Sequence, residues 1–120
     1  MAGTIVANTI NTDTGLFSTQ NAYSGIAKAW INFNGSTAAI RASFNVTSLT
    51  KQSTGNYTVT FSTAMADANY AAIVGTGQGD VLPSTNSNSN TPTTTTQTIR
   101  IRSTGGVDYD TSYVYMAVFD

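Results

Sequence analysis

Two aspartates near the end of the sequence are the residues best placed to carry chemistry. Asp108 and Asp110 are separated by one residue, so in an extended segment their carboxylates lie on the same side. Such a pair can hold a hard cation together with loop carbonyls, although calcium sites usually contain more acids. It can also imitate the two carboxylates of a glycosidase, which need a cleft and one raised pKa. We expect a polar turn instead, with no metal and no catalytic role.

Basic and aromatic side chains supply the candidate binding residues. Arg100 and Arg102 share one face of an expected strand, where they either meet an acidic or sugar ligand or protect a sheet edge. Trp30 is the only tryptophan, and its large area favours core or interface over a sugar platform. The candidate receptor or glycan contacts are Tyr109, Tyr113, Asp108, Asp110, Arg100 and Arg102.

The residue types that are missing exclude most familiar sites. The 120 residues include no His, no Cys and no Glu, which removes zinc, haem and iron–sulfur ligation and a Ser/His/Asp triad. Five scattered cations and a net charge of −1 give no phosphate-binding stripe, so nucleic acid is not an expected partner. The glycine run of residues 75–79 lacks the lysine and the following helix of a phosphate loop. We therefore expect a non-enzymatic protein without a cofactor.

Short alternating apolar runs, bounded by turn-forming residues, recur along the whole chain and predict an all-β fold. Tyr57, Val59 and Phe61 alternate with threonine and serine, as expected when one face of a strand meets a core and the other meets water. No apolar run approaches the roughly 20 residues that cross a bilayer as a helix, so membrane insertion is not expected. About seven strands in one domain of this length indicate an antiparallel β-sandwich. The expected strands are residues 5–10, 26–33, 37–44, 57–62, 70–74, 97–102 and 112–119, and residues 46–49 are expected as a short extension.

The connections between these strands carry further predictions. Asn34-Gly35 is typical of a two-residue type I′ hairpin turn. Residues 11–15 and 51–55 are expected turns, and residues 63–68 allow at most one helical turn. Residues 83–96 contain no large apolar side chain and are expected to form a long exposed loop, with recognition aromatics beside it if the protein binds glycan.

The final expected strand is apolar on both faces. Such a strand is either central in a sandwich or covered by another chain. The chain thus divides into an N-terminal strand or arm involved in assembly, residues 1–25, and a sandwich domain, residues 26–120.

Several segments in the first two thirds of the chain resemble a known protein family. They are Ala27-Lys-Ala-Trp-Ile-Asn-Phe-Asn-Gly35, Ala39-Ile-Arg-Ala-Ser-Phe-Asn-Val46, Thr54-Gly-Asn-Tyr-Thr-Val-Thr-Phe61 and Ala64-Met-Ala-Asp-Ala-Asn-Tyr70. In order and spacing, residues 26–75 look like a domain of bacteriophage tail-fibre and virion-surface proteins, notably of marine and cyanobacterial phages.

The resemblance implies a homotrimeric structural protein on the outside of the virion, assembled in the host cytoplasm. A fibre or knob subunit that attaches to a host surface, usually glycan, is the expected function. The alternative is a capsid decoration protein that binds other virion proteins and has no receptor role. The family has no catalytic motif to transfer.

Overall fold

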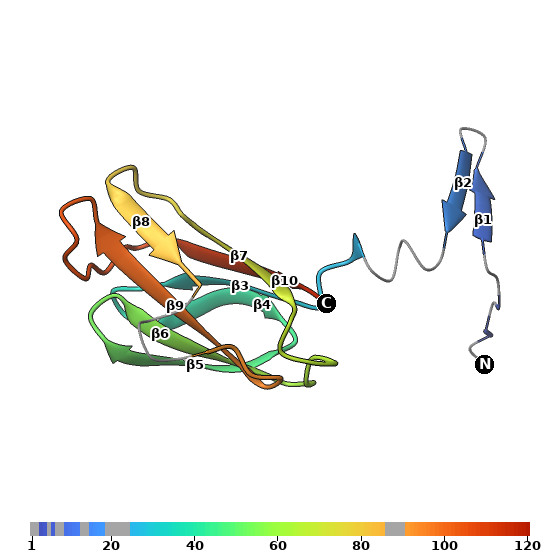
Figure 1. Cartoon of the computed structure of the whole chain (residues 1–120), viewed down its shortest axis with the longest axis horizontal. Helices are drawn as coiled ribbons and strands as arrows, with labels where there is room; N and C mark the ends of the chain where they lie inside the picture. Colours follow the sequence, from blue (N-terminus) through green and yellow to red (C-terminus); the bar gives the residue numbers. More distant parts are fainter. Residues whose placement is uncertain (1–2, 5, 7–8, 13–14, 19–24, 86–90) are drawn as a thin grey trace.

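Two four-stranded antiparallel sheets form the body of the protein (Figure 1). The computed structural model describes residues 3–4, 6, 9–12, 15–18, 25–85 and 91–120. The first sheet contains β3 (Ala29–Asn34), β4 (Ala39–Phe44), β7 (Ala71–Thr76) and β10 (Val114–Phe119), in the order β4-β3-β10-β7. The second contains β5 (Val46–Ser53), β6 (Asn56–Phe61), β8 (Val81–Ser84) and β9 (Thr96–Ser103), in the order β5-β6-β9-β8. The all-β architecture predicted by the alternating pattern is confirmed, with eight strands in the two sheets.

The core is built from alternate residues of the inner strands of both sheets. Apolar side chains from β3 and β10 meet those from β6 and β9, and Phe33 packs edge-on against Tyr57 with 5.0 Å between ring centroids. The expected inward faces are confirmed, and Gln97 is buried with its two isoleucine neighbours. The fully buried set on these four strands is Ala29, Ile31, Phe33, Tyr57, Val59, Gln97, Ile99, Ile101, Val114 and Val118.

The final strand lies in the interior of a sheet, which is one of the two arrangements predicted for it. β10 pairs with β3 on one side and β7 on the other, so it is central in its sheet. Val114, Met116 and Val118 face the core, whereas Tyr115 is 40% exposed on the opposite face. The apolar character of its second face therefore belongs to the outer surface of the sheet.

The N-terminal strands form a separate ladder. β1 (Thr9–Thr12) pairs with β2 (Gly15–Ser18), and Figure 1 shows this hairpin away from the two sheets. The expected strand at residues 5–10 is thus displaced toward the C-terminus, and the expected turn at 11–15 is wrong at both of its ends; residues 5, 7–8 and 13–14 lie outside the described residues. A two-stranded hairpin is marginally stable on its own.

The β3–β4 hairpin is confirmed, but its expected turn is wrong. Asn34 pairs with Ala39, so four residues connect the strands, and the positive φ of 55° belongs to Ala38. Gly35 is required for a different reason. A Cβ atom there would lie 2.6 Å from Tyr57 Oη and 2.7 Å from the Thr111 carbonyl oxygen, so only glycine lets the core approach this closely.

Two further connections differ from the expected ones. β5 continues to Ser53, which shortens the predicted 51–55 loop to a tight turn. Residues 63–68 form bends with no helical turn, because their amides bond elsewhere: Met65 N donates to the Thr94 carbonyl and Ala66 N to Asp120 Oδ2, at 2.8 and 2.7 Å.

The polar tract of residues 83–96 is shorter as a loop than predicted. Its first two residues complete β8 and Thr96 begins β9, because pairing with neighbouring strands overrides the polar composition. Tyr70 Oη donates to the carbonyls of Thr93 and Thr96, both at 3.0 Å. Residues 86–90 lie outside the described residues. In the part of the chain that is described, no helix is long and apolar enough to span a membrane.

Candidate functional site

A tight turn after β9 brings the two aspartates back onto the second sheet. Ser103 and Val107 close the turn through a 2.7 Å backbone hydrogen bond from Ser103 N to the Val107 carbonyl. Gly106 within it has a φ of 81°, a conformation that glycine adopts without strain. Tyr109 N then donates to the Ile101 carbonyl at 3.0 Å. The chain after the turn therefore runs back along β9.

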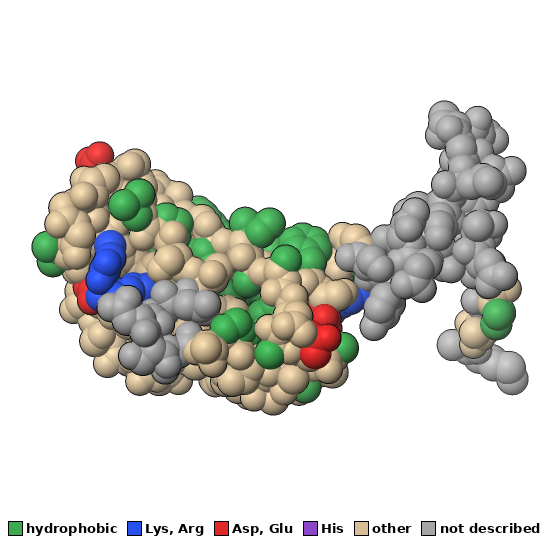
Figure 2. All heavy atoms as spheres, viewed as in Figure 1, with side chains coloured by type: hydrophobic (Ala, Val, Ile, Leu, Met, Phe, Trp, Pro, Cys, Tyr) green, Lys and Arg blue, Asp and Glu red, His purple; other side chains and the backbone are tan. Residues whose placement is uncertain are grey.

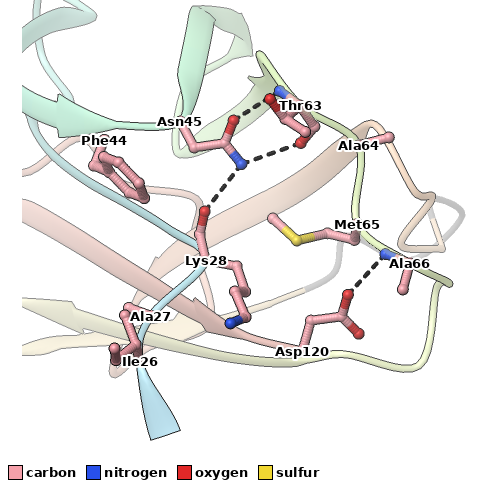
Figure 3. A pocket seen from close by; sticks show the side chains of 10 residues that line it. All are labelled: Ile26, Ala27, Lys28, Phe44, Asn45, Thr63, Ala64, Met65, Ala66 and Asp120. Atoms are coloured by element: carbon pink, nitrogen blue, oxygen red, sulfur yellow. Dashed lines mark hydrogen bonds between the residues drawn. The ribbon is translucent and has the colours of Figure 1, made fainter. Parts of the chain in front are cut away.

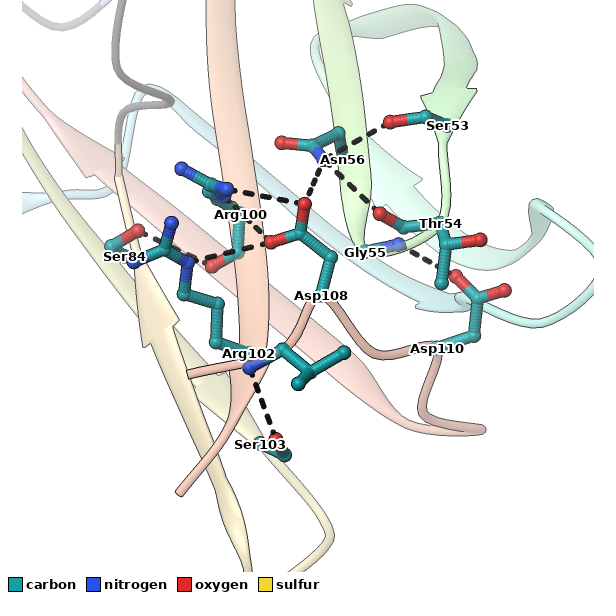
Figure 4. A network of polar contacts seen from close by, with 11 residues as sticks. Ser53, Thr54, Gly55, Asn56, Ser84, Arg100, Arg102, Ser103, Asp108 and Asp110 are labelled. Atoms are coloured by element: carbon teal, nitrogen blue, oxygen red, sulfur yellow. Dashed lines mark hydrogen bonds and ion pairs between the residues drawn. The ribbon is translucent and has the colours of Figure 1, made fainter. Parts of the chain in front are cut away.

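Asp108 lies between the two outward-facing arginines of β9. Its carboxylate accepts from Arg100 Nε at 2.8 Å and from Arg102 Nε at 3.4 Å, and Asn56 Nδ2 donates to it at 3.3 Å (Figure 4). Hydrogen bonding by Arg100 lowers the pKa of Asp108 most, with smaller contributions from Asn56 and Arg102. Because β9 is an inner strand between β6 and β8, the edge-protection interpretation of the arginines is wrong.

Asp110 holds the turn between β5 and β6. Its oxygens accept from Lys51 Nζ at 2.6 Å, from Tyr57 Oη at 2.6 Å and from Gly55 N at 2.9 Å. Partial burial raises the pKa of Asp110, but the bonds from Lys51, Tyr57 and Gly55 together outweigh it, so the net shift is downward. Burial and the nearby carboxylate raise the pKa of Tyr57, which keeps its hydroxyl protonated as a donor.

These contacts tie the segment of residues 107–110 to β9 and to the turn between β5 and β6. Both carboxylates turn toward the β5–β6 turn but use different donors (Figure 4). A glycosidase needs one carboxyl with a raised pKa, whereas the pKa values of Asp108 and Asp110 are both lowered. Among the described residues no three acids approach one another as a metal site. The geometry fits a structural clamp.

Chelation tests the metal interpretation directly. Because Asp108 and Asp110 already accept hydrogen bonds from cationic side chains, we expect EDTA to leave the melting temperature of the protein unchanged, as followed by circular dichroism. A fall of several degrees that excess Ca²⁺ reverses, and that an Asp108→Asn variant no longer shows, would contradict the clamp and establish a metal site.

The two candidate tyrosines contact different side chains. Tyr109 Oη lies 3.4 Å from Gln78 Nε2, and Tyr113 lies beneath Arg41, with 4.3 Å from the guanidinium carbon to the ring centroid. Gly77 allows Tyr113 to pack closely against it, since an added Cβ atom at residue 77 would lie 2.8 Å from the Cβ atom of Tyr113. This contact gives the glycine run a packing role.

The exposed aromatics do not lie beside residues 91–95 of the polar tract. Residues 91–95 precede β9, whereas residues 104–113 follow it, and Figure 1 shows the two segments at different ends of the strand. Thr94 and Thr95 bond to the amides of Met65 and Phe61. The predicted grouping of tyrosines and loop is therefore not seen for residues 91–95.

A surface that the sequence analysis did not identify lies on the outer face of the first sheet. Trp30 and Tyr115 are each 40% exposed there, Phe44 is 54% exposed and Ile73 is 65% exposed. Backbone register explains their grouping: Trp30 pairs with Phe44 and Ala117, and Ala117 pairs with Ile73. Figure 2 shows hydrophobic side chains above β7 and β10, whereas charged side chains lie toward the ends of the body. Trp30 is thus a surface residue.

A hollow of about 600 Å³ lies where the chain passes into β3. Asn45 closes one side of it: Nδ2 donates to the carbonyls of Lys28 and Thr63, and Oδ1 accepts from Thr63 N at 2.7 Å (Figure 3). Asp120 binds the backbone on the other side. The amide of Asn45 and the carboxylate of Asp120 are both engaged in hydrogen bonds that hold the fold.

The chain has no significant match among protein-family models, curated proteins or solved structures. The tail-fibre resemblance of residues 26–75 therefore stays a prediction.

Proposed function

We propose that this protein is a non-enzymatic subunit on the exterior of a bacteriophage particle, a fibre or knob component that attaches the virion to its host surface. The observation that carries the proposal is the exposed apolar and aromatic face on β3, β10 and β7. Exposed apolar patches on a stable scaffold commonly mark interaction sites. The sequence resemblance of residues 26–75 supplies the virion context.

The charged groups support binding over catalysis. Arg100, Asp108, Lys51 and Asp110 all pair within the chain, so these four side chains are committed to the fold. The remaining candidate acids and nucleophiles are Asp, Tyr, Lys, Ser and Thr, with no His or Cys to activate them. Attachment requires only a rigid surface, which the two sheets provide.

A capsid decoration protein is the second candidate, and the N-terminal hairpin favours it. Decoration predicts an ordered arm over residues 3–17 that reaches a neighbouring chain, and the β1–β2 ladder over residues 9–18 overlaps this range. Because such a ladder is marginally stable alone, contact with another chain would stabilise it. The same contact also suits assembly of a fibre subunit.

Labelling and adsorption together test the proposal. Antibodies against the chain, used on particles of the phage that encodes it, are expected to label the exterior at a fibre or tail position. Purified protein is expected to compete with those particles for adsorption to host cells. Label on the capsid without competition would establish decoration instead, and particles without exterior label would overturn both functions.

We expect the protein to be a homotrimer assembled through the N-terminal arm. Light scattering on the full chain should give three times the chain mass of 12.6 kDa. Deletion of residues 1–15 removes β1 and the start of β2, so it should yield a folded monomer. Replacing residues 86–90 with an equal length of Gly and Ser is the matched control and should leave the trimer intact. A full-length chain that scatters as a monomer at micromolar concentration contradicts the prediction.

A further inference from the structure

A shallow groove of about 410 Å³ crosses the outer face of the first sheet. Trp30, Ile73 and Tyr115 contribute its exposed side chains, whereas Gly75 and Ala117 lie between them. Register sets this arrangement, because Ala117 pairs with both Trp30 and Ile73, and Tyr115 pairs with Gly75. Small side chains at these two positions leave a hollow that larger ones would fill. Its volume lies in the range of roughly 300–1,000 Å³ that is usual for small-ligand sites.

The groove contains a polar atom that lacks a partner. Asn32 pairs with Tyr115 across β3 and β10, and both side chains line the groove. The Asn32 Oδ1 atom is buried and has no hydrogen-bond partner among the described residues. Because this oxygen has almost no exposed surface, a ligand hydroxyl group can reach it only after the Asn32 side chain turns toward the groove, and the bond then removes the cost of the unsatisfied acceptor.

The lining also restricts the charge of the ligand. None of the nine lining residues is Asp, Lys or Arg, so an ionic ligand would lose hydration without gaining an opposite charge. A pyranose ring presents an apolar C–H face and a rim of hydroxyls. Trp30 and Tyr115 offer flat, partly exposed aromatic surfaces to the face. Asn32 offers an acceptor to the rim only when its side chain turns toward the groove.

We propose that this groove, formed by Trp30, Asn32, Ile73, Gly75, Tyr115 and Ala117, is a binding site for a neutral glycan. The inference rests on the proposed attachment function and gives it a site and a ligand class. It also moves sugar recognition away from Tyr109 and the aspartates, which lie at the clamp.

Trp30 is the single tryptophan and lines the groove, so its fluorescence can report binding there. Full-length protein is titrated with neutral hexasaccharides of glucose, mannose and galactose, in α and β linkages, while the emission of Trp30 is recorded. At least one of them is expected to change the emission saturably at millimolar or lower concentration, whereas oligogalacturonate, which is anionic, is not. If none of the neutral sugars changes it up to about 10 mM, a weak limit for specific binding, the proposal is overturned.

Two variants locate the binding while keeping the reporter. Ala117→Val fills the floor of the groove with a residue that strands accommodate well, and Tyr115→Ala removes one aromatic wall. Each is expected to weaken binding at least about tenfold, equivalent to about 1.4 kcal/mol, with an unchanged melting temperature. Leu82→Ala, which truncates an exposed side chain on β8 of the other sheet, is the matched control and should bind as the unmodified chain does.

Other outcomes separate this proposal from the attachment function. Equal binding by Ala117→Val and the unmodified chain overturns the groove, and loss of binding in Tyr109→Ala returns the site to the clamp region. Emission that depends on protein concentration without sugar identifies the groove as a contact between copies of the chain. If the Ala117→Val protein still competes for adsorption to host cells, the attachment function stands and the proposed glycan site fails. If the unmodified chain binds sugar but does not compete for adsorption, the attachment function fails and the glycan site stands.

Discussion

Replacing Gly55 with alanine is expected to lower the free energy of unfolding by about 3 kcal/mol or more, combining left-handed backbone strain with overpacking. Gly55 has a φ of 68°. A Cβ atom there would lie 2.4 Å from the Ile101 carbonyl oxygen and 2.8 Å from Tyr109 N. These are backbone atoms of β9 and of the segment that returns along it, so neither can move away without breaking the ladder.

Two glycines in the turn after β9 separate the strain from the steric clash. Gly106 also has a positive φ, of 81°, but an added Cβ would meet nothing within 4 Å. Gly106→Ala should therefore cost only about 1 kcal/mol. At Gly105 the nearest atom would be a flexible serine hydroxyl at 3.7 Å, so Gly105→Ala should be close to neutral.

Urea unfolding followed by far-ultraviolet circular dichroism measures all three variants. The expected order of destabilisation is Gly55→Ala, then Gly106→Ala, then Gly105→Ala. If Gly55→Ala and Gly106→Ala were equally destabilised, the close approach of β9 to the β5–β6 turn would not exist in the folded protein. The clamp formed by Asp108 and Asp110 would then lose its geometric basis.

The inner strands could be predicted from sequence because their signal is local. Tyr57, Val59 and Phe61 alternate with threonine and serine, and the same period of two continues around Ile99 and Ile101. One face must then be buried and the other exposed, whichever strands lie alongside. The inward faces were predicted correctly for this reason.

Features that depend on a distant partner could not be predicted in the same way. Gly35 was assigned to a type I′ turn from its neighbour alone, whereas its requirement comes from Tyr57 and Thr111. The spacing of Asp108 and Asp110 draws attention to them as an acidic pair, but it does not show that Lys51 and Arg100 reach them.

The groove depends on long-range pairing. Trp30 and Tyr115 are neighbours only because β10 joins the sheet beside β3, and their strands are far apart in the sequence. Alternation places each residue on a face, but it does not say which strands adjoin. Gly75 and Ala117 shape the groove, but the sequence alone does not distinguish them from other small residues in the same region, such as Ala71 and Ala72.

The Asp110 carboxylate is expected to be the largest single polar contribution to stability. Asp110→Asn should lower the free energy of unfolding at pH 7 by about 2–3 kcal/mol, the usual range for hydrogen bonds to a charged group. The amide keeps the shape of the carboxylate, but it provides one acceptor for three donors. Its NH₂ group would face either Lys51 Nζ or Tyr57 Oη, which lie 2.6 Å from the present oxygens.

The effect of Asp110→Asn should depend on pH in a defined direction. The folded-state pKa of Asp110 lies below its ordinary value of 3.8, so the unfolded chain binds its proton first as the pH falls. The carboxylate's contribution is therefore complete above about pH 5 and is lost as the pH falls through the folded-state pKa. Urea unfolding at a series of pH values should show the unmodified protein approaching the variant at low pH.

Asp80→Asn provides the matched control, because Asp80 is an exposed aspartate outside the clamp. Its stability should differ from that of the unmodified protein by no more than about 0.5 kcal/mol at any pH. If Asp110→Asn and Asp80→Asn shared one pH profile, general charge would explain the acid sensitivity and the clamp would not. If Asp110→Asn alone removes the acid-dependent loss, the bonds from Lys51, Tyr57 and Gly55 join the returning segment to the second sheet, away from the groove on the first sheet.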